Sequence, residues 1–179
     1  MMMHTCSIGV MAYNEAVNIK SLLLDLLRQQ THNFLLVEII VVASGCTDST
    51  QDIITGLQKE DSRIRLIIQE QRQGKAAAIN LFLKEAKGEF IVLVGSDLKI
   101  VADVLSKVLE PLRQPGLGMT GGRPVPVDSN TSFMVYGVNL LWRLHHQLSL
   151  SRPKLGEFVA FKNLVKEIPK ETAVDEAYL

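Results

Sequence analysis

Polar side chains that could bind phosphate and a divalent cation follow four separate apolar stretches of this sequence. The clearest case is the apolar run at residues 90–94, which leads through Gly95 and Ser96 to Asp97. A carboxylate can hold Mg²⁺ or Mn²⁺ against phosphate oxygens, and Arg or Lys can pair with the phosphates themselves. The four groups, in chain order, are Tyr13, Asn14 and Glu15; residues 44–48; Arg72, Gly74 and Lys75; and Ser96 with Asp97.

The stretches that must position these groups alternate between strand and helix patterns. Strand-like runs cover residues 6–12, 36–43, 64–68 and 89–94, and helical patterns cover 16–30, 48–60, 74–87 and 101–114. Strands that are apolar throughout are typical of sheets with helices on both faces. The repeated strand–helix order predicts a parallel, right-handed, doubly wound sheet. Ligands of such sheets bind beyond the carboxyl ends of the strands, so we expect the four groups to meet there.

The pattern changes after residue 115. An extended segment at 115–127, a long apolar helix at 131–150 and a further strand at 154–163 precede the acidic pair Asp175 and Glu176. His145 and His146 are neighbours on the helix and point about 100° apart, so they are not predicted to share a metal. Trp142 and the leucines of this helix are expected to pack on the sheet.

Composition limits the function classes. The 179 residues suit one domain, 47% of them are hydrophobic, and 19 Lys and Arg balance 19 Asp and Glu, which argues against a nucleic-acid partner. Cys6 and Cys46 are too few for a disulfide framework and suit reduced thiols. No secretory pattern opens the chain, and no apolar run reaches the about 20 residues that span a bilayer. We therefore expect a cytoplasmic protein.

Four other site patterns do not match the sequence. A P-loop requires glycine and Ser/Thr where the sequence has Gln69 and Ala76. The first strand is followed by "MAYNEA", which lacks the G-x-G-x-x-G of dinucleotide sites. The same segment lacks the paired acids of a phosphorelay receiver. It also lacks the glycines and basic residues expected in this loop of a nucleotidyl transferase.

Five motifs in order resemble one known family. "MAYNE", "EIIVVASGCTDST", "QGKAAAIN", "GEFIVLVGSDL" and "AVDEA" are similar in order and spacing to the family 2 glycosyltransferases, inverting enzymes of the GT-A fold that use nucleotide-diphospho-sugars. The resemblance runs from Ile8 to about Glu176. It implies a single GT-A-like domain over residues 1–179, with a mostly parallel doubly wound sheet flanked by helices and an antiparallel strand late in the chain. The nucleotide-sugar half would cover about 1–100 and the acceptor half about 101–179, with a C-terminal truncation expected.

The resemblance also implies binding residues. Ala12, Tyr13, Asn14 and Glu15 would cradle the nucleoside. The family's "D-D-G-S-T-D" appears as residues 43–48, without both early acids, so the base contact would pass to Ser44 or to backbone groups. Asp48 remains but is better placed to cap the helix that follows. Arg72 or Lys75, beside Gly74, would contact phosphate or nucleoside, and Arg123 would reach diphosphate or acceptor.

The metal and the catalytic base complete the implied site. The family's D-x-D metal motif appears as Gly95-Ser96-Asp97, so Asp97 alone is predicted to bind Mg²⁺ or Mn²⁺. Asp175 and Glu176 stand where the family has its "ED" pair. Asp175 is the favoured base for an acceptor hydroxyl and Glu176 would orient it or bind the acceptor. The alternative is that both are exposed acids in the first turn of a C-terminal helix.

The sequence therefore predicts a metal-dependent inverting glycosyltransferase that moves sugar from a nucleotide-diphospho-sugar to a hydroxyl of a glycan or lipid-linked acceptor. Membrane association is expected only through segments outside this sequence, at the cytoplasmic face. The degenerate D-x-D motif keeps a second hypothesis open, namely a nucleotide-sugar-binding domain with weak or no catalysis.

Overall fold

The structure, a computed structural model, describes residues 3–123, 125, 136–137, 140–141, 143–144, 147 and 157–169. Trp142, His145 and His146 lie outside the described residues, as does the pair Asp175 and Glu176. The residues described between 136 and 147 are helical, as predicted. The predicted packing of this helix is wrong for Leu140, Leu141 and Leu144, which are exposed.

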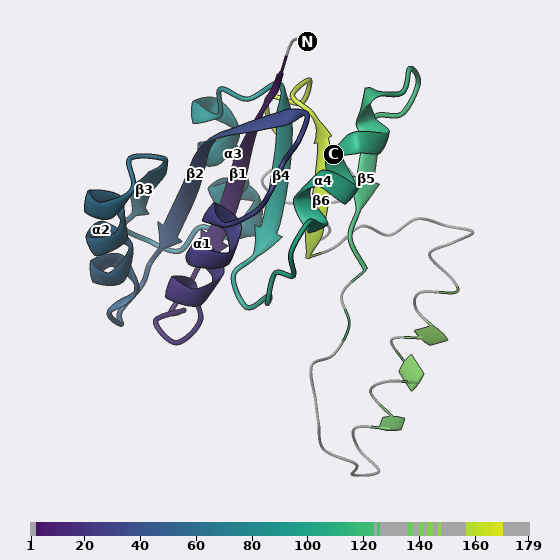
Figure 1. Ribbon diagram of the computed structural model, residues 1–179. Helices are drawn as coiled ribbons and strands as arrows, with labels where there is room; N and C mark the ends of the chain where they lie inside the picture. Colours follow the sequence, from purple (N-terminus) through teal and green to yellow (C-terminus); the bar gives the residue numbers. More distant parts are fainter. Residues whose placement is uncertain are drawn as a thin grey trace.

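A six-stranded sheet forms the centre of the domain, in the order β3-β2-β1-β4-β6-β5. Strands β1, β2, β3 and β4 run parallel, and β6 runs antiparallel to both of its neighbours, β4 and β5 (Figure 1). This confirms the predicted mostly parallel sheet with a late antiparallel strand. The strands are β1 His4–Ala12, β2 Phe34–Ser44, β3 Ile64–Gln69, β4 Phe90–Gly95, β5 Met119–Gly121 and β6 Phe158–Lys162.

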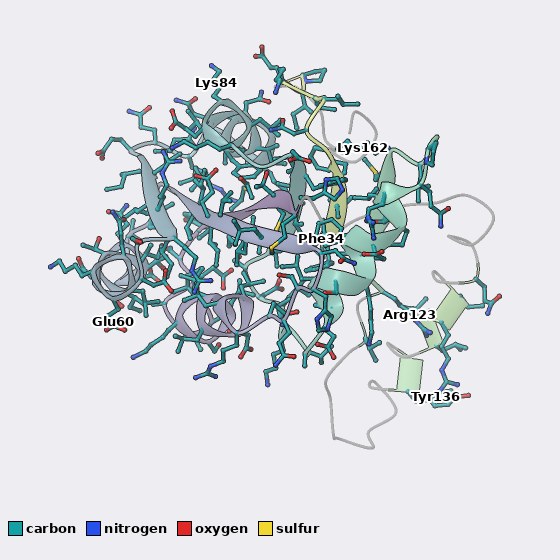
Figure 2. The ribbon with its side chains drawn as sticks, turned by 45° about the horizontal axis from the view of Figure 1, so that its top comes forward. Phe34, Glu60, Lys84, Arg123, Tyr136 and Lys162 are labelled. Carbon is teal, nitrogen blue, oxygen red and sulfur yellow. The ribbon has the colours of Figure 1, made fainter. Side chains whose placement is uncertain are left out.

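Helices cover both faces of the sheet. One core cluster joins α1 (Ile19–Leu27), α2 (Thr50–Glu60) and α4 (Val104–Leu109) to one face, and another joins α3 (Lys75–Glu85) to the other. Figure 2 shows Lys84 of α3 and Glu60 of α2 on opposite sides of the sheet. Burial on both faces explains why the strands are apolar throughout instead of alternating.

Two predicted elements differ in extent. The helix expected at 101–114 is α4 followed by the 3-10 turn η1 (Glu110–Arg113). Pro111 lies near the start of that turn, and proline has no N–H to continue an α-helical ladder. The extended segment at 115–127 contributes the short strand β5, which pairs with β6.

A buried polar cluster ties the sheet together at the end opposite the carboxyl ends of the parallel strands. Glu38 is only 4% exposed. Its carboxylate accepts hydrogen bonds from the Ser7 hydroxyl at 2.8 Å, the Lys87 N–H at 2.8 Å and Arg65 Nη1 at 2.7 Å. Burial raises the pKa of Glu38, but the bond to Arg65 and the two other donors outweigh it and hold the pKa below its usual range.

The cluster predicts a pH-dependent stability. Arg65 bridges buried Glu38 and half-exposed Glu85, so Glu38→Gln should lower the free energy of unfolding by about 2 kcal/mol at pH 7. Because the folded-state pKa of Glu38 is lowered, its contribution is complete above the unfolded-state value of about 4.3 and is lost as the pH falls through the folded-state value. The wild-type advantage over Glu38→Gln should therefore shrink below about pH 4.

Urea unfolding at a series of pH values measures this difference. Glu85→Gln is the matched control, since it removes the exposed partner of the same arginine and should cost below about 1 kcal/mol. Equal losses for the two variants at pH 7 would contradict the role given to burial.

Candidate functional site

A cavity of about 350 Å³ opens at the carboxyl ends of β1, β2 and β4. The chain brings most of the predicted binding residues to its wall, although they come from four different loops. Tyr13 and Lys75, more than sixty positions apart in the sequence, line the same cavity. The predicted residues on the wall are Ala12, Tyr13, Glu15, Ser44, Arg72, Lys75, Ser96 and Asp97.

Asn14 and Arg123 are not among the residues that line this cavity. Asn14 adopts a left-handed backbone conformation with φ of 54°. Its side-chain oxygen accepts a hydrogen bond from the Thr47 N–H at 2.8 Å, and its amide donates to the Thr47 hydroxyl at 3.2 Å. Asn14 therefore ties the loop after β1 to the loop after β2. Arg123 is exposed just beyond β5 (Figure 2), and strand β6 separates β5 from β4 in the sheet.

Asp48 has a structural role, as the sequence favoured, but it is not itself the N-cap of α2. The N-cap of α2 is Ser49, while Asp48 accepts hydrogen bonds from the Thr50 N–H at 3.0 Å, the Thr50 hydroxyl at 2.5 Å and the Ala16 N–H at 3.1 Å. The bond from the Thr50 hydroxyl is the main reason why the pKa of Asp48 is lowered. This carboxylate holds the start of α2 against the loop that leads into α1.

Arg72 and Tyr13 form a stacked pair at the cavity. The guanidinium carbon of Arg72 lies 4.1 Å from the centre of the Tyr13 ring, and such a cation–π contact stabilises an exposed pair by about 0.5–1 kcal/mol. Gly45 permits the approach, because its φ is 62° and a Cβ there would lie 3.0 Å from the backbone nitrogen of Arg72. An aromatic face and a cation on one wall suit a ligand with a planar base and phosphates.

Ser44 and Gln69 pair beneath the cavity. The Ser44 hydroxyl donates to the Gln69 side-chain oxygen at 2.5 Å, and both residues are buried. Since its proton is committed to Gln69, Ser44 faces a ligand with the acceptor capacity of its oxygen. Sequence reasoning did not identify Gln69 as this partner. Its position at the end of β3, opposite Ser44 in the parallel register, is the signal that could have found it.

The positive end of a helix also borders the cavity. Gly74 is the N-cap of α3 and Lys75 is its first residue, and both line the wall. Gly74 has a φ of 90°, a conformation that side chains rarely adopt. The N-terminus of a helix attracts anions through its unpaired N–H groups and its dipole, so this part of the wall suits phosphate.

Another part of the wall is acidic, and one of its residues was not predicted. Glu157 precedes β6, lines the cavity with Asp97, and accepts a backbone hydrogen bond from the Gly95 N–H at 2.7 Å. A Cβ built on Gly95 would lie 2.6 Å from Oε2 of Glu157 and 3.3 Å from Oδ1 of Asp97. Within the part of the chain that the structure describes, no group of three or more His, Cys, Asp or Glu side chains could hold a metal ion.

The family model described as Glycosyl transferase family 2 matches residues 7–170, so the chain belongs to that family. It is 34% identical to an uncharacterized glycosyltransferase of Haemophilus influenzae over 122 residues, which cover 68% of this chain and 48% of that protein. The chain spans about half the length of the first curated relatives that it matches.

Solved structures share the fold. The mannosyltransferase of Pyrobaculum calidifontis in complex with GDP-Man and Mn²⁺ superposes with a TM-score of 0.76 at 24% identity, over 98% of this chain and 50% of that one. Residues 1–349 of Staphylococcus aureus TarS in complex with UDP give a TM-score of 0.66 at 23% identity, over 96% and 53%. These likenesses confirm the predicted GT-A-like fold.

Among the described residues, no helix is long and apolar enough to cross a membrane.

The Asn14 contact predicts a difference between two substitutions. Asn14→Ala should cost about 2 kcal/mol of unfolding free energy, about half from the lost hydrogen bonds and half from placing Ala in the left-handed region. Asn14→Gly loses the same bonds without the backbone strain and should cost about 1 kcal/mol. Urea unfolding of both variants measures the difference, and a larger loss for Asn14→Gly would show that backbone strain is not the cause.

Proposed function

We propose that this chain binds a nucleotide-diphospho-sugar of the UDP or GDP type and acts as a metal-dependent inverting glycosyltransferase. The observation that carries the proposal is the cavity itself. It joins an aromatic–cation pair, a helix N-terminus and a carboxylate, which are the groups that a base, a diphosphate and a divalent cation require. Family membership supports it, as do the complexes of the similar solved structures with GDP-Man and Mn²⁺ or with UDP.

Each wall of the cavity has a role in donor binding. Tyr13 and Arg72 form the flat surface on which a base can lie, and Ser44 offers it an acceptor oxygen. Lys75 and the N-terminus of α3 face the diphosphate. Asp97 would hold Mg²⁺ or Mn²⁺, for which its carboxylate is a suitable ligand on the wall of the cavity. A bound cation supplies neutralisation of the charge that develops on the departing diphosphate.

The transfer itself is a single displacement at the anomeric carbon. The acceptor oxygen forms a bond to that carbon as the bond from carbon to the diphosphate breaks, which inverts the configuration. The acceptor hydroxyl loses its proton to a carboxylate. We assign this base to Asp175, with Glu176 as its orienting neighbour, on the family's motif alone, and we assign the acceptor to the class of glycans or lipid-linked glycans.

Donor binding is tested by calorimetry with UDP and GDP, with and without Mn²⁺. Mn²⁺ should strengthen nucleotide binding, and Asp97→Asn should reduce that gain in affinity by at least about tenfold. Even the loss of a residue that only supports a metal ligand typically lowers metal affinity 10–100-fold. Asp25→Asn is the matched control, since Asp25 lies near the end of α1, away from the cavity. Equal, metal-independent binding by wild type and Asp97→Asn would rule out this role of Asp97.

Transfer is tested at Asp175. Asp175→Asn should lower turnover by about 10²–10⁴-fold and leave donor affinity unchanged, because a general base acts on the acceptor and not on the nucleotide. Release of UDP or GDP from UDP-glucose, UDP-N-acetylglucosamine and GDP-mannose, with glycan and lipid-linked acceptors, measures turnover. A variant that keeps full turnover would remove Asp175 from the mechanism.

The second candidate function is a nucleotide-sugar-binding domain without transfer. The loss of the first acid of the D-x-D motif at Gly95 favours it. Tight, Mn²⁺-dependent nucleotide binding with no turnover of any donor, in this chain and in a longer form of the protein, would establish this second function.

A further inference from the structure

We propose that Glu157 supplies the carboxylate that the D-x-D motif lacks at Gly95, so that a divalent cation is held between Asp97 of one loop and Glu157 of another. This inference rests on the proposed function, because it assigns a second ligand to the cation of the same site. A motif whose two acids usually stand two positions apart in sequence would here be assembled from residues sixty positions apart.

The strand pairing places Glu157 opposite Gly95. Strand β6 runs antiparallel to β4 with Val94 opposite Phe158, and the Gly95 N–H donates to the Glu157 carbonyl at 2.7 Å. Residues opposite each other in an antiparallel pair project from the same face of the sheet, with Cβ atoms about 5 Å apart. The Glu157 side chain therefore leaves the sheet on the face where a side chain of residue 95 would stand.

The Glu157 carboxylate fills the place of that absent side chain. Its Oε2 lies 2.6 Å from the position that a Cβ of residue 95 would take, and Oδ1 of Asp97 lies 3.3 Å from the same point. A side chain at position 95 would have to displace this carboxylate. Glycine at 95 thus leaves room for the Glu157 carboxylate, which occupies the space that a side chain at position 95 would take.

The surroundings suit a cation that is shared with a phosphate ligand. Two carboxylates around one point repel each other unless a positive charge lies between them. Both line the same cavity as Lys75 and the N-terminus of α3, to which the proposed function assigns the diphosphate. Mg²⁺ is usually bound through one or two carboxylates together with substrate phosphates and water, and Asp97 with Glu157 provides that number.

Binding of Mn²⁺ itself tests the inference without any need for turnover. Electron paramagnetic resonance measures free Mn²⁺ during titration of the protein saturated with UDP, and in parallel with GDP. Glu157→Gln, which keeps the size of the side chain and removes its charge, should weaken Mn²⁺ binding at least about tenfold, as Asp97→Asn does. Glu60→Gln, at the end of α2 and outside the cavity, should bind like the wild type.

A swap of positions separates a ligand from a residue that merely shapes the loop. Glu157→Ala should weaken Mn²⁺ binding, and Gly95→Asp added to it should restore the affinity to within about threefold of the wild type, because the acid returns to the same space. Circular dichroism and thermal unfolding establish that each variant is folded. Recovery in the double variant supports the inference even if Glu157→Ala lowers stability.

Two outcomes overturn the inference, and they differ in what else they remove. If the wild type binds Mn²⁺ with UDP or GDP and folded Glu157→Gln binds it within twofold, Glu157 is not a ligand while the proposed function stands. If the wild type shows no Mn²⁺-dependent nucleotide binding, the metal site proposed for Asp97 falls together with the role of Glu157.

Discussion

The register of three parallel strands is the constraint on which the site depends. Strand β1 pairs with both β2 and β4, with Ala12 opposite Ala43 and Met11 opposite Gly95. Because these strands end at the same level, the loops that follow them open onto one cavity. A slip of one residue would turn every side chain of β1 to the other face. Gly9 would then no longer face the Phe82 ring of α3. At present glycine leaves room for that ring, because a Cβ on residue 9 would lie 2.8 Å from it.

Polar contacts between loops then refine what the register brings together. Asn14 joins the loop after β1 to the loop after β2, and Asp48 joins α2 to the loop before α1. These side chains form hydrogen bonds within the protein, so they position the wall of the cavity, while neighbouring residues are the ones that can contact a ligand. The Arg72–Tyr13 stack likewise joins the loop after β3 to the loop after β1, but it also leaves an aromatic face and a cation at the cavity.

The sequence was sufficient for the order of elements and for the edge of the sheet at which the cavity lies. Apolar strands and the periodic stripe of α1 follow from local patterns, and the convergence of Tyr13 with Lys75 follows from the topology rule for parallel sheets. Loop geometry was harder to foresee. Nothing in the letters "AYNE" shows that Asn14 adopts a left-handed conformation and turns to Thr47. The exposed Leu140, Leu141 and Leu144 have the apolar pattern of a packed helix, and composition alone does not tell which surface covers such a helix.

Glu157 marks the limit of motif reading most clearly. In the sequence it is one more acid before a strand, and Gly95 is a lost ligand that favours a domain without catalysis. In space the two positions are opposite each other across β4 and β6, a pairing that local patterns do not specify because strands so far apart in sequence can pair in several ways. A count of acids within one motif therefore underestimates the negative charge around Asp97. If Glu157 takes the proposed place, that charge equals the charge of an intact D-x-D pair, and the glycine at 95 leaves room for the second acid instead of marking the loss of the site.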